Sequence, residues 1–149
     1  EDKKVLVMAT ALTLKEEKFK KLVHITGGDR RVEGVPMPSL VTFAEEKKFS
    51  GTEVENYIIQ SIKDFKLEEF GTLVLGCTHF IYFKEIIRRV LPKHIDIIDG
   101  NIGTINNLIS KLKGVNMQKG TGSIEFYSSG KKSNKEEFQE YLSFLQKQK

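Results

Sequence analysis

The single cysteine of this chain stands in a setting that favours acid–base chemistry. The stretch GTLVLGCTHFIYF, residues 71–83, places Cys77 directly after an apolar run, between Gly76 and the pair Thr78 and His79. A cysteine used only for packing is expected inside such a run. A thiolate can remove a proton, and a histidine can donate or accept one near neutral pH. We therefore interpret Cys77 as a catalytic thiol with His79 as its neighbour in proton transfer.

The elements on either side determine how these residues are presented. Residues 72–75 are predicted to form a buried strand, and residues 80–90 a helix. At the start of a helix, free backbone N–H groups and the positive end of the helix dipole favour an anion and a thiolate. Gly76 lets the backbone approach a ligand closely, and Thr78 offers a hydroxyl donor. The combination predicts a thiolate that removes a proton from a substrate carrying a carboxylate.

Strands alternate with helices along the rest of the chain, which predicts an α/β fold with a mostly parallel sheet and flanking helices. The further predicted strands are 3–10, 95–99 and 123–127, with an extended segment that ends at Pro38. The further predicted helices are 11–23, with Leu14, Phe19 and Leu22 on its inner side, and 39–47, 52–65, 101–112 and 135–146. A stretch rich in glycine and polar residues, 114–123, is the predicted linker.

Ligands of open parallel sheets bind beyond the carboxyl ends of the strands. Thr10 and Thr13 follow the first predicted strand, and Asp99 follows the strand at 95–99, so both reach the same edge as Cys77. Each has a simpler explanation: a helix N-cap with its neighbour for the threonines, and a turn for Asp99. Glu45 is equally explained as a solvated helix end. A lone cysteine or histidine is most often structural, so the residues alone leave both interpretations open.

Composition limits the class of protein. The 149 residues suffice for one domain or two lobes, and the net charge of +4 is spread along the chain, so nucleic acid is not the expected partner. One cysteine excludes an internal disulfide and a zinc site built from cysteine pairs. A free thiol suits a reducing compartment, so we expect a cytoplasmic protein. No apolar run approaches the roughly 20 residues of a membrane span.

A resemblance adds to this interpretation. LVLGCTHF, residues 73–80, resembles the signature around the second catalytic cysteine of the glutamate racemases, in the cofactor-independent Asp/Glu racemase family. Further stretches resemble that family in the same order, namely VLVMATALTL, PMPSLVTFAEE, IDIIDG and FYSSG. The chain departs from the family at three positions: Ala9 and Lys47 each stand where a glycine is usual, and Met37 where a cysteine is common.

The resemblance implies one lobe of a two-lobe fold. Residues 1–100 would be the second α/β lobe, and residues 101–149 a segment that in the family packs on the N-terminal lobe. That lobe carries an Asp-Ser turn and the first catalytic cysteine, and neither is found here. Because the chain starts at Glu1 instead of a methionine, we expect that an upstream segment is absent. The chain alone is therefore expected to be inactive.

The resemblance also implies roles for individual residues. Cys77 would act as the thiolate toward L-glutamate, with His79 assisting its proton traffic and Glu45 lying nearby. Thr78, Gly76 and, on weaker support, Thr10 would bind the substrate. No cofactor and no metal are implied. The product, D-glutamate, would supply peptidoglycan synthesis, and with it cell-wall biogenesis and cell shape.

Two other functions stay open at this point. The first is a related racemase or isomerase that acts on another small dicarboxylate such as aspartate; His79 favours glutamate, because aspartate racemases resemble a Cys-Thr-Glu version of the motif. A non-catalytic binding module with a structural cysteine is the second alternative. The sequence does not fix the oligomeric state, so a homo-oligomer is also left open.

Overall fold

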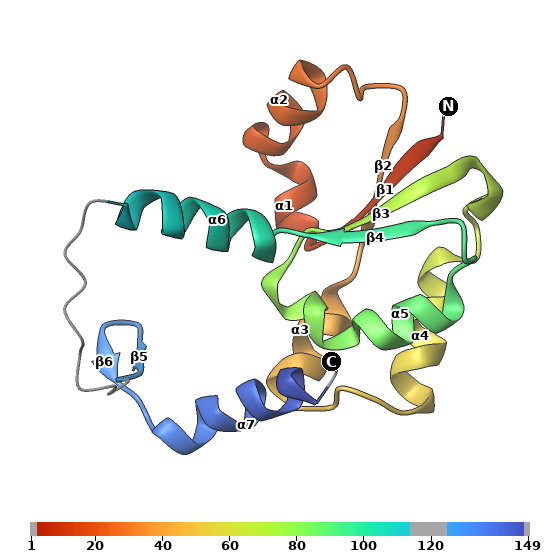
Figure 1. The fold of residues 1–149 in the computed structure, drawn as a ribbon. Helices are drawn as coiled ribbons and strands as arrows, with labels where there is room; N and C mark the ends of the chain where they lie inside the picture. The colour runs from red at the N-terminus through yellow and green to blue at the C-terminus, as the bar shows by residue number, and fades with distance from the viewer. Residues whose placement is uncertain (1–2, 114–124, 148–149) are drawn as a thin grey trace. The chain divides into compact units, whose positions relative to one another are not determined.

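The computed structural model describes residues 3–113 and 125–147 (Figure 1). The chain divides into two compact units, residues 1–101 and 102–149. None of the helices in these described ranges is long and apolar enough to cross a membrane.

The first unit is built on a four-stranded parallel sheet with the strand order β2-β1-β3-β4. Its strands are β1 (Lys4–Ala9), β2 (Val32–Pro36), β3 (Phe70–Leu75) and β4 (Asp96–Asp99). Parallel neighbours need a crossover between them, and a helix supplies it in each case. The predicted α/β class with a mostly parallel sheet is confirmed.

The crossover helices cover the sheet on both sides. They are α1 (Ala11–Lys15), α2 (Glu17–Ile25), α3 (Pro38–Glu45), α4 (Thr52–Ile62) and α5 (Lys84–Val90), with 3₁₀ helices η1 (Leu67–Glu69) and η2 (Thr78–Phe83). Figure 1 shows α3, α4 and α5 gathered on one side of the sheet, and α1 and α2 on the other. The main core is fully buried and combines strand residues with residues of α3, α4 and α5, including Leu6, Met8, Leu73, Leu40, Ile58 and Ile87.

The single helix predicted over 11–23 is wrong, because the chain breaks at Glu16. Glu16 has an extended backbone (φ −63°, ψ 137°), and its N–H bonds back to the carbonyls of Leu12 and Thr13, which closes α1 after one turn. Leu14 packs against Gly34 of β2, but Leu22 on α2 is 60% exposed. The sequence pattern therefore marks helical residues correctly but overstates how much of α2 is buried.

The second unit contains most of α6 (Asn101–Leu112), a short hairpin and α7 (Lys135–Gln146). Both helices have the predicted bounds. The hairpin pairs β5 (Tyr127–Ser128) with β6 (Lys131–Lys132) in antiparallel fashion, whereas a strand was predicted over 123–127. Residues 123 and 124 and the predicted linker, 114–123, lie outside the described residues, and Glu125 and Phe126 are not in a strand.

Lys47 ends α3 in a backbone conformation that favours glycine. Its φ is +58°, in the left-handed region. The N–H of Lys47 bonds to the carbonyl of Ala44 and that of Lys48 to Phe43, which is the Schellman pattern of helix termination. This explains why the position is usually a glycine in the family that the sequence resembles, and why a lysine here is strained.

We expect Lys47→Gly to raise the free energy of unfolding by about 1 kcal/mol relative to Lys47→Ala, because both remove the side chain but only glycine removes the clash of Cβ at positive φ. Chemical denaturation of the two variants measures the difference. Equal stability of the glycine and alanine variants would contradict this explanation of the helix end.

Candidate functional site

The sheet brings three strand ends to one edge. Met8 of β1 pairs with Leu75 of β3, and Leu75 pairs with Asp99 of β4. Because the strands are parallel, the residues that follow them leave the sheet on the same side. Thr10, Cys77 and Asp99 are therefore placed along one edge, as the sequence pattern predicts.

Gly76 fixes the point at which the chain leaves β3. Its N–H donates to the carbonyl of Met8 at 2.8 Å. A Cβ at this position would lie 3.0 Å from that carbonyl oxygen and 3.2 Å from the Cβ of Ala9. The glycine thus favours the close approach to β1, which is a structural reason that the sequence did not reveal. Its predicted contact with a ligand stays a prediction.

Cys77 and His79 lie close together just beyond Gly76. The Cys77 thiol is half-buried and free, and its Sγ is 3.7 Å from Nδ1 of His79, within hydrogen-bonding reach for sulfur. Cys77 occupies the N-cap position of η2, but its side chain makes no capping hydrogen bond. The thiol is therefore available to exchange a proton with the imidazole or with a bound molecule.

The segment after Cys77 differs in type from the prediction. An α-helix was expected over 80–90, whereas η2 is a 3₁₀ helix and α5 begins only at Lys84. Phe80 and Phe83 explain the difference: both are fully buried, and a 3₁₀ helix aligns residues three apart on one face. The helix dipole that acts on Cys77 is therefore weaker than an α-helix would supply, because a short 3₁₀ segment aligns few peptide dipoles.

The remaining predicted site residues are Thr78, Thr10 and Glu45. Thr78 is exposed at the start of η2. Thr10 caps α1, since its Oγ1 accepts from the N–H of Thr13 and lies 2.8 Å from the Thr13 hydroxyl. Glu45 is the exposed last residue of α3, a helix that packs against η2. Their contacts with a substrate stay predictions.

Asp99 accepts two hydrogen bonds at this edge, and sequence reasoning did not predict its ion-pair partner, Lys84. Its Oδ2 accepts from Nζ of Lys84 at 3.0 Å, and its Oδ1 accepts from the N–H of Asn101 at 3.0 Å. Burial alone would raise the pKa of Asp99, but the Asn101 N–H and the Lys84 ammonium outweigh it and hold that pKa below its ordinary value of 3.8. A pair separated by 15 residues leaves no local sequence signal.

This shift makes the contribution of Asp99 depend on pH. A carboxylate whose pKa is lowered by folding stabilises the folded state above its unfolded pKa, of about 4, and loses that contribution as pH falls through the folded value. We expect Asp99→Asn to reduce the free energy of unfolding at pH 7, and this difference from the unsubstituted chain to shrink below pH about 4. Urea unfolding at several pH values measures it, and a pH-independent difference would contradict the assignment.

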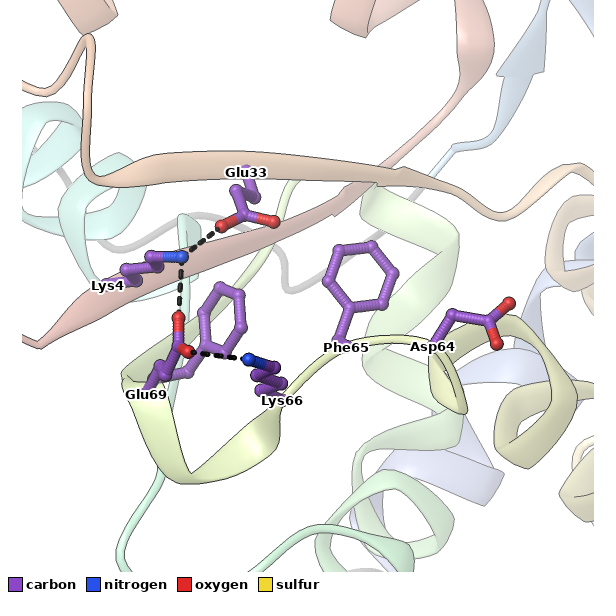
Figure 2. A pocket seen from close by; sticks show the side chains of 7 residues that line it. Lys4, Glu33, Asp64, Phe65, Lys66 and Glu69 are labelled. Atoms are coloured by element: carbon purple, nitrogen blue, oxygen red, sulfur yellow. Dashed lines mark ion pairs between the residues drawn. The ribbon is translucent and has the colours of Figure 1, made fainter.

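A cavity of about 350 Å³ lies at the opposite edge of the sheet (Figure 2). Lys4 contacts Glu33 at 2.9 Å and Glu69 at 2.6 Å, and Lys66 lies 3.9 Å from Glu69. Their hydrogen bonds and charges raise the pKa of Lys4 and lower that of Glu69. These charges largely neutralise one another, and the cavity is at the amino ends of the strands, away from Cys77. We interpret the charged residues that line this cavity as an ion-pair network that joins β1, β2 and the η1 segment.

The described residues include no candidate metal site. Across residues 3–113 and 125–147, no three or more His, Cys, Asp or Glu side chains gather closely enough to hold a metal ion.

Known proteins with similar sequences are glutamate racemases. That of Halothermothrix orenii is 44% identical over 147 residues, which is 97% of this chain and 58% of the relative. That of Campylobacter curvus is 43% identical over 130 residues, covering 87% of this chain and 49% of the relative. The chain thus spans about half the length of the curated relatives it matches. No protein-family model matches it.

Solved structures of the same kind share the fold. Glutamate racemase from Campylobacter jejuni superposes with a TM-score of 0.75 at 20% identity, over 97% of this chain and 56% of the other. Glutamate racemase from Francisella tularensis, solved in complex with D-glutamate, gives 0.67 at 28% identity, over 80% and 45%.

Proposed function

Because this chain belongs to the glutamate racemase family, we propose that it forms the second lobe and C-terminal segment of an enzyme that interconverts L- and D-glutamate. The observation that supports this most directly is the Cys77–His79 pair, at the carboxyl edge of the sheet, in a chain 44% identical to a glutamate racemase. The reaction uses acid–base chemistry at carbon and needs no cofactor.

Two opposed acid–base groups are needed for this reaction. Inversion at the α-carbon removes a weakly acidic proton from one face and delivers another to the opposite face, and one thiol reaches only one face. Donors at the substrate carboxylate stabilise the charge that develops there in the transition state. Cys77 is the only cysteine of the chain, so the second thiol of the site comes from a segment outside these 149 residues.

The proposed roles follow from this arrangement. Cys77 takes the α-proton of L-glutamate and protonates the carbanion in the reverse direction, and His79 exchanges protons with its thiol. Thr78 and the backbone at Gly76 contact the substrate carboxylate, Thr10 is a weaker contact, and Glu45 approaches from α3. Residues 1–100 form the lobe and residues 101–149 pack on the other lobe.

An exposed apolar row on α6 supports the proposed packing. Ile102, Ile105, Leu108 and Ile109 recur at helical spacing and are 72%, 54%, 57% and 54% exposed. An amphipathic helix normally buries such a row. The N-terminal lobe of the family is the proposed cover, since relatives are about twice as long as the matched segment. We further propose that the enzyme acts in the cytoplasm and supplies D-glutamate to peptidoglycan synthesis, and so to cell-wall biogenesis and cell shape.

The chain alone should not racemise glutamate, and combination with an N-terminal lobe should restore activity. The experiment co-expresses the 149 residues with the N-terminal part of the Halothermothrix orenii enzyme that the chain does not match, and follows L- to D-glutamate conversion by circular dichroism. The N-terminal part with a Cys77→Ala version of this chain is the control. Turnover by the chain alone would contradict the two-group argument.

In the combined enzyme, Cys77→Ser should lower racemisation about 10²–10⁴-fold, because a serine hydroxyl is a far weaker acid than a thiol. A glutamate analogue with a good β-leaving group needs only one proton removed, so the variant should still eliminate from the D-enantiomer, which faces the surviving thiol. Equal loss of elimination from both enantiomers, with an unchanged far-ultraviolet spectrum, would show that Cys77 is not a base for one face.

A further inference from the structure

The turn that carries Cys77 is attached to the rest of the first unit at three points. At its start, Gly76 bonds to the Met8 carbonyl of β1 at 2.8 Å. In its middle, Phe80 and Phe83 are fully buried in the core. At its end, Lys84 reaches Asp99 at the end of β4 with a bond of 3.0 Å. The first two attachments are backbone and apolar contacts, and the third is polar.

We propose that the Lys84–Asp99 ion pair is a positioning element of the site, which fixes the end of the Cys77–Phe83 turn against the end of β4. Its effect on Cys77 as a base rests on the function proposed above, whereas its effect on the rigidity of the turn does not.

The geometry around Asp99 separates it from an ordinary surface ion pair. Its side chain is only 13% exposed, while that of Lys84 is 41% exposed. Both carboxylate oxygens are engaged, one by the Lys84 ammonium and one by the N–H of Asn101 at the start of α6. A carboxylate held by two donors keeps one orientation, so it is a fixed anchor for the lysine.

The same geometry argues against Asp99 as a group that touches the substrate. A carboxylate close to the α-carboxylate of glutamate would repel it, and both oxygens of Asp99 already accept hydrogen bonds from the protein. Asp99 lies beside Leu75 in the register of β3 and β4, two residues before Cys77. A shift of the turn by a fraction of an ångström changes the distance between a base and its proton, which strongly affects the rate.

The pair can be tested on the 149-residue chain by amide hydrogen exchange. The reporter is the N–H of Phe80, which donates to the carbonyl of Cys77 at 3.0 Å within the turn. In Lys84→Met and Asp99→Asn we expect this amide to exchange about tenfold faster, because a lost charge-assisted contact makes local opening easier. Lys84→Arg keeps the charge and should restore the slow rate.

Two controls separate local loosening from general destabilisation. The N–H of Val5, bonded to Arg31 near the amino ends of the strands, should change its exchange rate by no more than the loss in free energy of unfolding measured by denaturation of each Lys84 or Asp99 variant, and by less than the Phe80 amide does. Lys4→Met removes a lysine of comparable exposure from the ion-pair network of Figure 2, and should leave the Phe80 amide unchanged. The double variant of Lys84 and Asp99 should exchange no faster than either single variant, since the two act through one contact.

The combined enzyme provides the kinetic arm. Lys84→Met and Asp99→Asn should lower kcat for racemisation about tenfold and leave KM for glutamate within about twofold, because the pair places the base and does not bind substrate. Unchanged exchange at Phe80 in both variants would overturn the proposal, whatever the activity. Faster exchange with unchanged kcat would overturn the positioning role. If the unsubstituted combined enzyme does not racemise glutamate, the proposed function fails, and the exchange result alone decides whether the pair holds the turn.

Discussion

The hydrogen bond from Gly76 to the Met8 carbonyl determines where the chain leaves the sheet, and the site depends on that point. It continues the parallel pairing of β1 and β3 by one residue past the end of β3, and a Cβ at Gly76 would crowd the Met8 carbonyl and Ala9 of β1. Cys77 is the first residue free of the ladder, and its backbone is extended (φ −139°, ψ 140°) before the 3₁₀ turn begins. The sheet thereby sets the position of the thiol, and the turn sets its direction.

Two buried aromatic rings and one ion pair then hold the turn against the rest of the unit. Phe80 and Phe83 draw one side of η2 into the core, which leaves Cys77, Thr78 and His79 partly or fully exposed before them. Proton transfer from carbon needs a base that is accessible to a substrate and yet fixed in place. A short 3₁₀ turn meets both demands, since its buried face supplies rigidity and its first residues remain at the surface.

Sequence reasoning predicted the features that depend on local pattern. The parallel α/β class, the bounds of α6 and α7, and the placement of Cys77 at the carboxyl edge all follow from apolar periodicity and from the order of the elements. It failed where tertiary packing decides the local structure. The extended backbone of Glu16 interrupts the predicted helix, and the burial of Phe80 and Phe83 accompanies the 3₁₀ form of η2; neither feature is marked by a helix-breaking residue in those stretches.

The Lys84–Asp99 pair shows why a site is harder to predict than a fold. Asp99 was recognised as a polar residue at the correct edge, but a turn was its simplest explanation from sequence. Only the folded chain shows that Lys84, the first residue of α5, lies against Asp99 at the end of β4. With both oxygens of Asp99 engaged, we place it apart from the residues proposed to meet a substrate at this edge, among them Cys77, Thr78 and His79. The proposed role of Cys77 as the one acid–base thiol of this chain suits a reaction in which the opposite face of the substrate is served by the lobe proposed to complete the enzyme.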